Sequence, residues 1–458
     1  MFALSDSTQL PKENKMGVMP IGRLLITMSL PVMISMLVQA LYNVVDSIFV
    51  AQISESALTA VSLTFPVQNL MIAIGGGTAV GINALLSRSL GEKNYREVDN
   101  AANNGVFLAL MSGIVFLILG VLFSRSFFQS QTGDAEIVEY GVSYLSICSI
   151  GSFALFGQIT FERLLQSTGR SIYSMVSQIT GAVLNIILDP IMIFGLLGFP
   201  AMGVAGAALA TVIGQFCGMA LALYLNIRKN SELHMSVRGF RPRWATIRKI
   251  YSVGLPSIIM VSIGSVMIYG MNGILMRFTS TAAAVLGVYF KLQSFVFMPV
   301  FGLNNGLVPI VAYNYGARKK RRMIDAIRLS MIYAMSIMLL GFLVFQIYPD
   351  RLLLLFNASP DMLTIGIHAL RRISISYLLA GFCIISGTVF QALGHGFLSL
   401  FCSLARQLLA LLPVAYLLSL MGNLDLVWFS FPIAEAVSVV LSVVFLRYVY
   451  RTSIAPLP

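Results

Sequence analysis

The stretch LPVMISMLVQALYNVVDSIFV covers residues 30–50, and Asp46 is its only charged side chain. A helix of about 20 mostly apolar residues is long enough to cross the hydrocarbon core of a bilayer. Strands at that depth would need a closed barrel to pair their backbone groups, so the stretch predicts a membrane-spanning helix. Eleven similar stretches follow it, and the twelve predicted spans centre near Ile34, Ile72, Ile114, Ser149, Leu184, Gly214, Val261, Met298, Ser336, Leu379, Leu409 and Val439.

The composition supports an all-α polytopic membrane protein. Of the 458 residues, 57% are hydrophobic and only 10% are charged, whereas a soluble domain carries roughly 25% charged residues. This excludes a soluble enzyme, a secreted domain and a DNA-binding protein. The four cysteines lie in apolar runs without CxxC spacing, and the three histidines are scattered, so neither disulfides nor a zinc site is predicted. We interpret the polar opening residues as a cytoplasmic tail without a cleaved signal peptide.

The basic residues predict the orientation of the spans. With the N-terminus and every second loop on one side, 23 of the 30 lysines and arginines collect there, Arg163 among them, and five lie on the opposite side. Cytoplasmic loops carry such an excess, so we expect both termini in the cytoplasm and the protein in the cytoplasmic membrane. The run ARKKRR at 317–322 fits this rule better than a lipid or nucleic-acid patch, and we expect no nucleic-acid partner.

The sequence contains an internal duplication. Five pairs of landmarks stand 225 residues apart: Pro31 and Pro256, Gln68 and Gln293, Gly91 and Gly316, Gln166 and Gln391, Gly169 and Gly394. Six spans per copy is an even number, so both copies begin on the same side of the membrane and form parallel repeats. This predicts two six-helix lobes around a central cavity, a transporter architecture. We expect an amino-terminal lobe at 1–228, a cytoplasmic linker at 229–249 and a carboxy-terminal lobe at 250–458.

Four acids lie inside the predicted spans: Asp46, Glu162, Asp189 and Glu435. A charged side chain at mid-membrane costs about 2.5–3.5 kcal/mol on insertion scales, so each acid there needs a partner or a function. Each also has a structural interpretation: Asp46 at the membrane interface, Asp189 pinning a kinked helix, and Glu162 paired with the adjacent Arg163. For Glu435 the sequence shows no partner.

The surroundings of Asp189 favour a cation site. Asn185 precedes it by four residues and shares its helix face. Pro190 follows it and cannot donate a backbone hydrogen bond, which leaves a carbonyl without a partner. Thr211 and Ala207, four apart on the next span, can close the group. Carboxylate, amide and carbonyl oxygens together suit a sodium ion or a proton.

The second half lacks equivalent acids, because the residues 225 positions after Asp46, Glu162 and Asp189 are Met271, Gly387 and Val414. It has Lys291 and Arg406 inside spans instead. We therefore expect ion coupling in the first lobe. Lys291 either neutralises a carboxylate across the cavity or extends toward the membrane surface, and Glu162, Gln68, Gln293 and Lys291 are further candidates for contact with substrate or coupling ion. GGGTAVG at 75–81 predicts close helix packing, and no Walker motif indicates ATP.

Several segments carry a resemblance to the multidrug and toxic compound extrusion (MATE) family, nearly from end to end: residues 30–50, SRSLGEKN (87–94), LNIILDPIMIFG (184–195), GVAGAALATVI (203–213) and IVAYNYGARK (310–319). The resemblance implies a two-lobed antiporter with a cation site in its first lobe. The family's site residues match Asp46, Asn185, Asp189 and Thr211, with Ala207 offering a carbonyl. Glu162 matches a fourth-helix glutamate of multidrug-exporting relatives.

These observations predict a secondary antiporter that exports lipophilic, often cationic compounds in exchange for sodium or protons. We expect no cofactor, no enzymatic activity and a monomer embedded in the lipid bilayer. A flippase for lipids or lipid-linked saccharides on the same architecture is the first alternative, and it would line its cavity with several basic residues. A polytopic membrane enzyme is the second, and it would need clustered histidines or paired carboxylates near one face.

Overall fold

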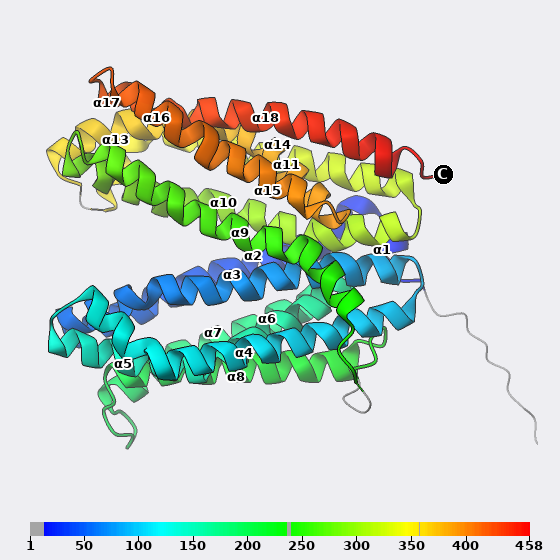
Figure 1. The fold of residues 1–458 in the computed structure, drawn as a ribbon, viewed down its shortest axis with the longest axis horizontal. Coiled ribbons are helices and arrows are strands. Elements are labelled where there is room, and N and C mark those ends of the chain that lie inside the picture. Colours follow the sequence, from blue (N-terminus) through cyan, green and yellow to red (C-terminus); the bar gives the residue numbers. More distant parts are fainter. Residues whose placement is uncertain (1–12, 236–239, 357) are drawn as a thin grey trace, which may run out of the picture.

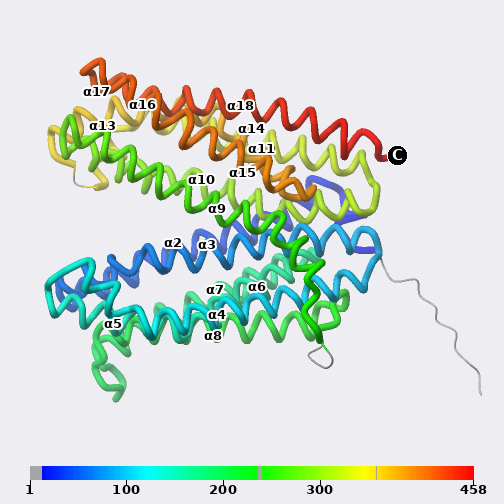
Figure 2. The backbone as a smooth tube through the Cα atoms, in the orientation of Figure 1, coloured from blue at the N-terminus to red at the C-terminus, as the bar shows by residue number. Residues whose placement is uncertain are grey.

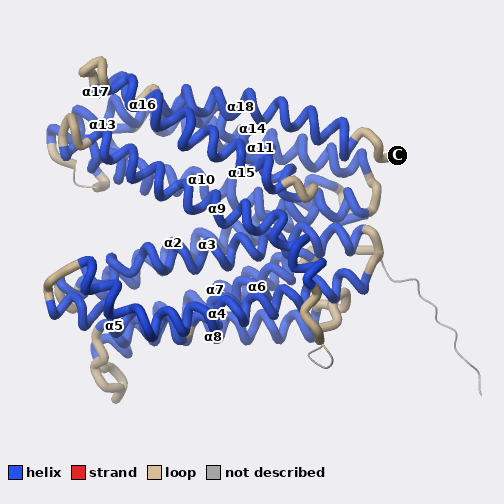
Figure 3. Tube along the Cα trace, in the orientation of Figure 1, coloured by secondary structure: helices blue, strands red, loops and turns tan. Residues whose placement is uncertain are grey.

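The chain folds into helices that form two bundles. The structure is a computed structural model that describes residues 13–235, 240–356 and 358–458. Within those ranges there is no β-strand, and the loops gather at the two ends of the bundles (Figure 3). In Figure 1, α2 to α8 form one bundle and α9 to α18 the other. The prediction of an all-α, two-lobed protein is confirmed.

The first bundle, which we call the first lobe, follows a short helix α1 (Lys15–Val18). It contains α2 (Ile21–Ala51), α3 (Glu55–Gly91), α4 (Tyr95–Gln131), α5 (Ala135–Ile150), α6 (Ser152–Ser167), α7 (Ser171–Phe194) and α8 (Val204–Lys229). The second lobe begins with α9 (Trp244–Leu275), α10 (Ser280–Gly316), α11 (Lys320–Ile347), α12 (Pro349–Leu354), α13 (Pro360–Ile373) and η1 (Ser374–Ser376). It continues with α14 (Tyr377–Ala392), α15 (Gly396–Leu404), the π-helix η2 (Ala405–Leu411), α16 (Leu412–Ser419), α17 (Leu424–Val427), α18 (Ser430–Val449) and the π-helix η3 (Tyr450–Ile454).

The helices provide the expected number of spans. Among the described residues, eleven helices or continuous helix runs are long and apolar enough to cross a membrane. The twelfth span is the pair α5 and α6, which bends by 46° at Gly151. A methyl group on Gly151 would lie 2.4 Å from a side-chain carbon of Val212, so glycine allows α8 to pack against the bend. The structure therefore has twelve candidate spans, one of which is a bent helix pair.

The duplication recurs in the geometry of the two lobes. α3 and α10 begin and end at positions 225 residues apart, and each is capped by a hydroxyl, Ser54 in one and Thr279 in the other. That hydroxyl accepts a hydrogen bond from the backbone three residues later, which satisfies an otherwise free N–H group. Gly169 and Gly394 both adopt the left-handed backbone conformation, with φ of +87° and +86°. The landmarks thus mark equivalent turns and helix ends.

The lobes cross where glycines remove side chains from their interface. A Cβ atom on Gly81 of α3 would lie 2.1 Å from the carbonyl oxygen of Ile250 on α9, and one on Gly77 would also meet α9 backbone. Gly302 and Gly306, 225 residues later on α10, make the same approach to α2. Toward the other end, near α5 and α13, the lobes diverge (Figure 2). The close packing predicted for residues 75–81 is therefore a contact between lobes at Gly77 and Gly81, whereas Gly75 packs against α6 of its own lobe.

The segment around α1 connects both lobes at the end where they converge. The Asn14 side-chain amide donates to the carbonyl of Thr168 at 3.0 Å, in the first lobe. From the second lobe, Asn314 donates to the carbonyl of Met16 at 3.0 Å and Arg322 to that of Met19 at 2.6 Å. These bonds hold the lobes together at the end that carries most of the basic loops.

Candidate functional site

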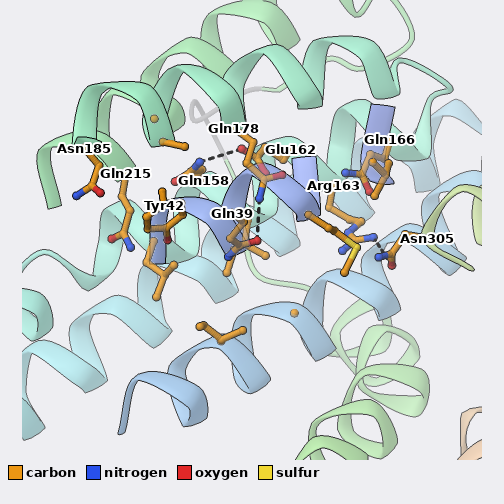
Figure 4. Close-up of a pocket in the computed structure, with 18 of the residues that line it drawn as sticks. Gln39, Tyr42, Gln158, Glu162, Arg163, Gln166, Gln178, Asn185, Gln215 and Asn305 are labelled. Carbon is orange, nitrogen blue, oxygen red and sulfur yellow. Dashed lines mark hydrogen bonds between the residues drawn. The ribbon is translucent and has the colours of Figure 1, made fainter. Parts of the chain in front are cut away.

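Two adjoining cavities lie in the first lobe beside the gap between lobes. The first, of about 270 Å³, is the glutamine cavity, lined by Met36, Gln39, Tyr42, Gln158, Glu162, Arg163, Gln166, Gln178, Asn185, Thr211, Gln215 and Asn305 among others (Figure 4). The second, of about 490 Å³, is the aspartate cavity, lined by Gln39, Tyr42, Asp46, Gln68, Asn69, Tyr144, Cys148, Thr211 and Gln215 among others. Both volumes lie at the lower end or just below the range of small-molecule sites, and the shared lining makes them neighbours.

Asp46 and Asp189 are brought together by the packing of α2 against α7. Asp46 is half-buried and lines the aspartate cavity, whereas Asp189 is 0% exposed behind it. The two carboxyl groups are close enough to interact electrostatically, and a hydrogen bond between them would need a proton on one of them. Oδ1 of Asp46 and Oδ2 of Asp189 are buried and have no hydrogen-bond partner. Two buried acceptors without donors need a proton or a cation.

Asn185 and Thr211 complete this group from the sides. The Asn185 amide donates to the Thr211 hydroxyl at 3.2 Å and to the Asp189 carboxylate at 3.4 Å, while its own Oδ1 is buried without a partner. Ala207 lies one turn before Thr211 on α8 and is 0% exposed. Asn185 therefore contacts two of the other predicted residues, Asp189 and Thr211, and Ala207 lies on the same helix as Thr211.

Backbone contacts between α7 and α8 determine this spacing. A Cβ atom on Gly214 would lie 2.6 Å from the carbonyl oxygen of Gly181, and one on Gly181 would lie 2.8 Å from that of Gly214. Larger residues at either position would separate Asn185 from Thr211. α7 also continues through Pro190, whose missing N–H leaves the carbonyl of residue 186 without its intrahelical donor. The group thus offers carboxylate, amide, hydroxyl and carbonyl oxygens.

This donor set fits a hard monovalent cation or a proton. The unpartnered oxygens of Asp46, Asn185 and Asp189 are all acceptors, and oxygen ligands are those that hard cations take. Among the described residues no group of three or more His, Cys, Asp or Glu forms a metal site.

Glu162 and Arg163 do not pair with each other. The Glu162 carboxylate accepts hydrogen bonds from Gln158 at 2.9 Å and Ser177 at 3.1 Å, and Arg163 donates to Asn305 of α10 at 3.1 Å. Adjacent residues on a helix point in different directions, which explains why the expected ion pair is absent. Arg163, which the charge pattern groups with the basic loops of one side, lies instead within α6, lines the glutamine cavity and bonds to the other lobe (Figure 4).

Gln68 and Gln293 line corresponding cavities in the two lobes. Gln68 borders the aspartate cavity and donates to the Tyr144 hydroxyl at 3.4 Å. Gln293 borders a cavity of about 500 Å³, here called the aromatic cavity, with Met36, Met267, Tyr289, Phe290, Phe297, Met298, Phe301, Arg406, Gln407, Phe431 and Glu435 among its other lining residues. Lys291 is exposed elsewhere on α10, with its amine 5.9 Å from the Phe356 ring centroid.

Glu435 has no partner that is evident from the sequence, and the structure provides one. Nη1 of Arg406 donates to Oε2 of Glu435 at 3.2 Å. The two residues are 29 positions apart and lie in neighbouring spans. Spacing along the helix of Glu435 therefore does not indicate the pair. Two intramembrane charges of opposite sign were the available signal.

The cluster of glutamines in the glutamine cavity was also not predicted from the sequence. Gln178 donates to Gln39 at 2.9 Å and links α7 to α2 (Figure 4). Gln158 and Gln215 project from α6 and α8 into the same space. Each is an isolated amide within an apolar run, and its distance from the others in sequence conceals the cluster.

Comparison with known proteins agrees with this architecture. A family model described as MatE matches residues 31–191 and 256–417. The multidrug export protein MepA of Staphylococcus haemolyticus is 29% identical over 92% of each chain, and a FAD transporter of Shewanella oneidensis is 26% identical over 91% of this chain and 92% of its own. A solved multidrug resistance MATE family transporter in an outward-facing conformation has a TM-score of 0.88 at 26% identity, and the match covers 95% of this chain and 97% of that one.

Proposed function

The chain belongs to the MatE family, and we propose that it exports chemically varied small molecules across the cytoplasmic membrane in exchange for sodium ions or protons. The family is one of transporters, so the protein is not an enzyme. The observation that carries the proposal is the carboxyl pair of Asp46 and Asp189: each has a buried oxygen without a hydrogen-bond partner, and Asp46 lines a cavity large enough for a small molecule.

The carboxyl pair gives the cavity two charge states. With an ion or protons bound, the pair is neutralised; without them, two negative charges attract a lipophilic cation. Coulomb attraction is strong where water is scarce, so a drug cation and the coupling ion compete for the same charges. One charge moving inward down a 100 mV potential releases about 2.3 kcal/mol, enough for roughly a fifty-fold drug gradient at one-to-one coupling.

Opening and closing of the cavity requires the two lobes to rock against each other. The likeness to an outward-facing transporter supports the assignment of this conformation to the outward-facing state. The positive-inside distribution supports placing the convergent end, with α1 and the basic loops, in the cytoplasm. In this state the aspartate cavity is reached from outside, where ion binding would release the drug.

A flippase for lipid-linked saccharides is the less supported alternative. Such a substrate carries phosphates, and a cavity for it needs several cations. Among the described residues, the linings of the glutamine, aspartate and aromatic cavities contain only two basic residues, Arg163 and Arg406. Arg163 bonds to Asn305 and Arg406 pairs with Glu435.

Replacement of Asp189 by Asn tests the proposal. Asparagine has nearly the same shape but holds no charge, so the variant should fold and insert yet lose ion-driven export of ethidium from vesicles. Asp325→Asn, at an exposed position on α11, is the matched control and should export like the parent. Equal ethidium export by Asp189→Asn and the parent would contradict the assignment.

The coupling ion is identified by imposing one gradient at a time. Vesicles that contain the parent protein receive a sodium gradient at constant pH, and then a pH gradient without sodium. The proposal requires that at least one gradient drives ethidium and that the same gradient fails with Asp189→Asn. Export driven by neither gradient, with protein correctly inserted, would contradict secondary transport.

A further inference from the structure

The second lobe contains a buried ion pair that the coupling mechanism does not use. Glu435 of α18 is 5% exposed, and Arg406 of η2 donates to its Oε2. The other carboxylate oxygen, Oε1, is buried and accepts no hydrogen bond, although the weakly donating thiol of Cys383 lies beside the carboxylate. Buried carboxylate oxygens are normally hydrogen-bonded, so the free oxygen is an acceptor that is available to a ligand.

Arg406 has unused hydrogen-bonding capacity directed at the same space. A guanidinium has five N–H donors, and the described contacts of Arg406 use one of its nitrogens. The side chain is 31% exposed and lines the aromatic cavity together with Glu435. Arginine binds carboxylates in a two-pronged geometry, which gives this half of the pair a preferred ligand group.

The backbone is arranged to present Arg406. Residues 405–411 form a π-helix, a rare element that often marks functional sites. Pro413 follows it near the start of α16 and cannot donate to the carbonyl of residue 409, so the regular ladder is broken here. Within this element, Arg406 contacts Glu435 of α18.

The remaining walls of this cavity favour a flat aromatic molecule. Tyr289 and Phe431 meet edge to face with ring centroids 5.9 Å apart, and Phe297 and Met298 lie in the same wall. Met36 of α2 completes the lining from the first lobe, so the cavity faces the space between lobes. Aromatic and methionine side chains contact planar apolar ligands favourably and adapt to their shape.

From these contacts we infer that the Arg406–Glu435 pair and the aromatic cavity form a second substrate subsite, for planar aromatic compounds that carry both a carboxylate and a positively charged amine. The carboxylate binds the free donors of Arg406, and an amine N–H binds Oε1 of Glu435. A compound with only a positive charge would have to compete with Arg406 for Glu435. A compound with only a negative charge would leave Oε1 without a donor. The inference rests on the proposed function, because it assigns a substrate class to the exporter.

A matched pair of dyes tests the subsite. Rhodamine 110 carries a free carboxylate, and rhodamine 123 is its methyl ester, with the same ring system and amino groups but a net positive charge. Binding of each dye to the purified protein is measured by fluorescence polarisation. The variant R406Q/E435Q removes both charges together, so no unpaired charge is left buried, and R125Q/E139Q removes an exposed ion pair as the control.

The subsite requires R406Q/E435Q to weaken rhodamine 110 binding by about tenfold or more, as expected for lost charge-assisted hydrogen bonds. Rhodamine 123 binding should change by less than about threefold, and the control should leave both dyes unaffected. If R406Q/E435Q does not fold, Arg406→Lys is tested instead. Lysine keeps the positive charge but lacks the two-pronged guanidinium, so this variant should weaken the binding of rhodamine 110 and not that of rhodamine 123.

Three results would overturn the inference: equal weakening of both dyes, no weakening of either, or no binding of rhodamine 110 to the parent. Each differs from failure of the proposed function, which is measured separately as ion-driven ethidium export and its loss in Asp189→Asn. If ethidium export is not ion-driven but rhodamine 110 binding still depends on Arg406, the subsite stands and the coupling proposal fails.

Discussion

Replacing Gly81 by alanine should open the contact that holds the lobes together at their convergent end. The added Cβ would lie 2.1 Å from the Ile250 carbonyl oxygen, whereas ordinary contacts begin at 3.4 Å, so α3 and α9 must separate by about 1 Å. Overpacking of this kind costs roughly 1–3 kcal/mol. That cost falls only on the conformation in which the helices touch, so the equilibrium should shift away from it by about 5- to 150-fold.

Spin labels at Leu197 and Leu355 measure this shift. Both positions are strongly exposed, at 85% and 76%, and they lie beyond α7 and α12 at the divergent ends of the two lobes. With the four cysteines replaced by serine, the Gly81→Ala variant should gain a population with a shorter distance between labels. Gly76→Ala is the control, because its Cβ meets nothing within 4 Å and the helix propensity changes equally. Identical distance distributions in the two variants would refute the role of this crossing.

Three further substitutions have defined outcomes. Gly214→Val should push α8 away from α7 at Gly181. Ion-driven ethidium export should then fall at least tenfold while membrane insertion is unchanged, since a loss of roughly 1.4 kcal/mol in ion-binding free energy lowers affinity tenfold. Unchanged export would show that this helix spacing is unimportant. Arg322→Gln removes a donor to the Met19 carbonyl and should lower the free energy of unfolding by about 1.5–3 kcal/mol, read from thermal melting in detergent. Burial raises the pKa of Glu232 despite the opposing Asn14 hydrogen bond, so its contribution to stability is present at low pH and lost as pH rises through the folded-state pKa. Glu232→Gln should therefore melt at an increasingly higher temperature than the parent as pH rises from acid to neutral, and a pH-independent difference would contradict this.

The fold was predictable because membrane spans are encoded locally. Each span is a run of apolar residues, and the 225-residue offset relates the two copies without any knowledge of packing. The family model reproduces that offset, since its two matches begin at residues 31 and 256. The break within the fourth span was not predicted, because one glycine in an apolar run does not by itself mark a bend, and the close approach of Val212 to Gly151 is seen only in the structure.

The candidate site was partly predictable for the same reason. Asn185 and Asp189 share a helix face by spacing alone, whereas the approach of Asp46 to them was inferred from the family resemblance. A single sequence does not show which distant helices pack against each other, even where it shows intramembrane charges of opposite sign. This is why the Arg406–Glu435 pair and the bond from Arg163 to Asn305 were missed. The sodium or proton assignment also depends on ion-site geometry that residue types do not specify.

The most direct test of the account is the dependence of ethidium affinity on sodium concentration and pH in the purified protein. If the coupling ion and the drug compete for the charges of Asp46 and Asp189, the parent's affinity should fall as sodium or proton concentration rises. The variant in which both residues are replaced by asparagine should bind ethidium more weakly, with an affinity that no longer responds to either ion. The same ion dependence in this variant and the parent would contradict the account.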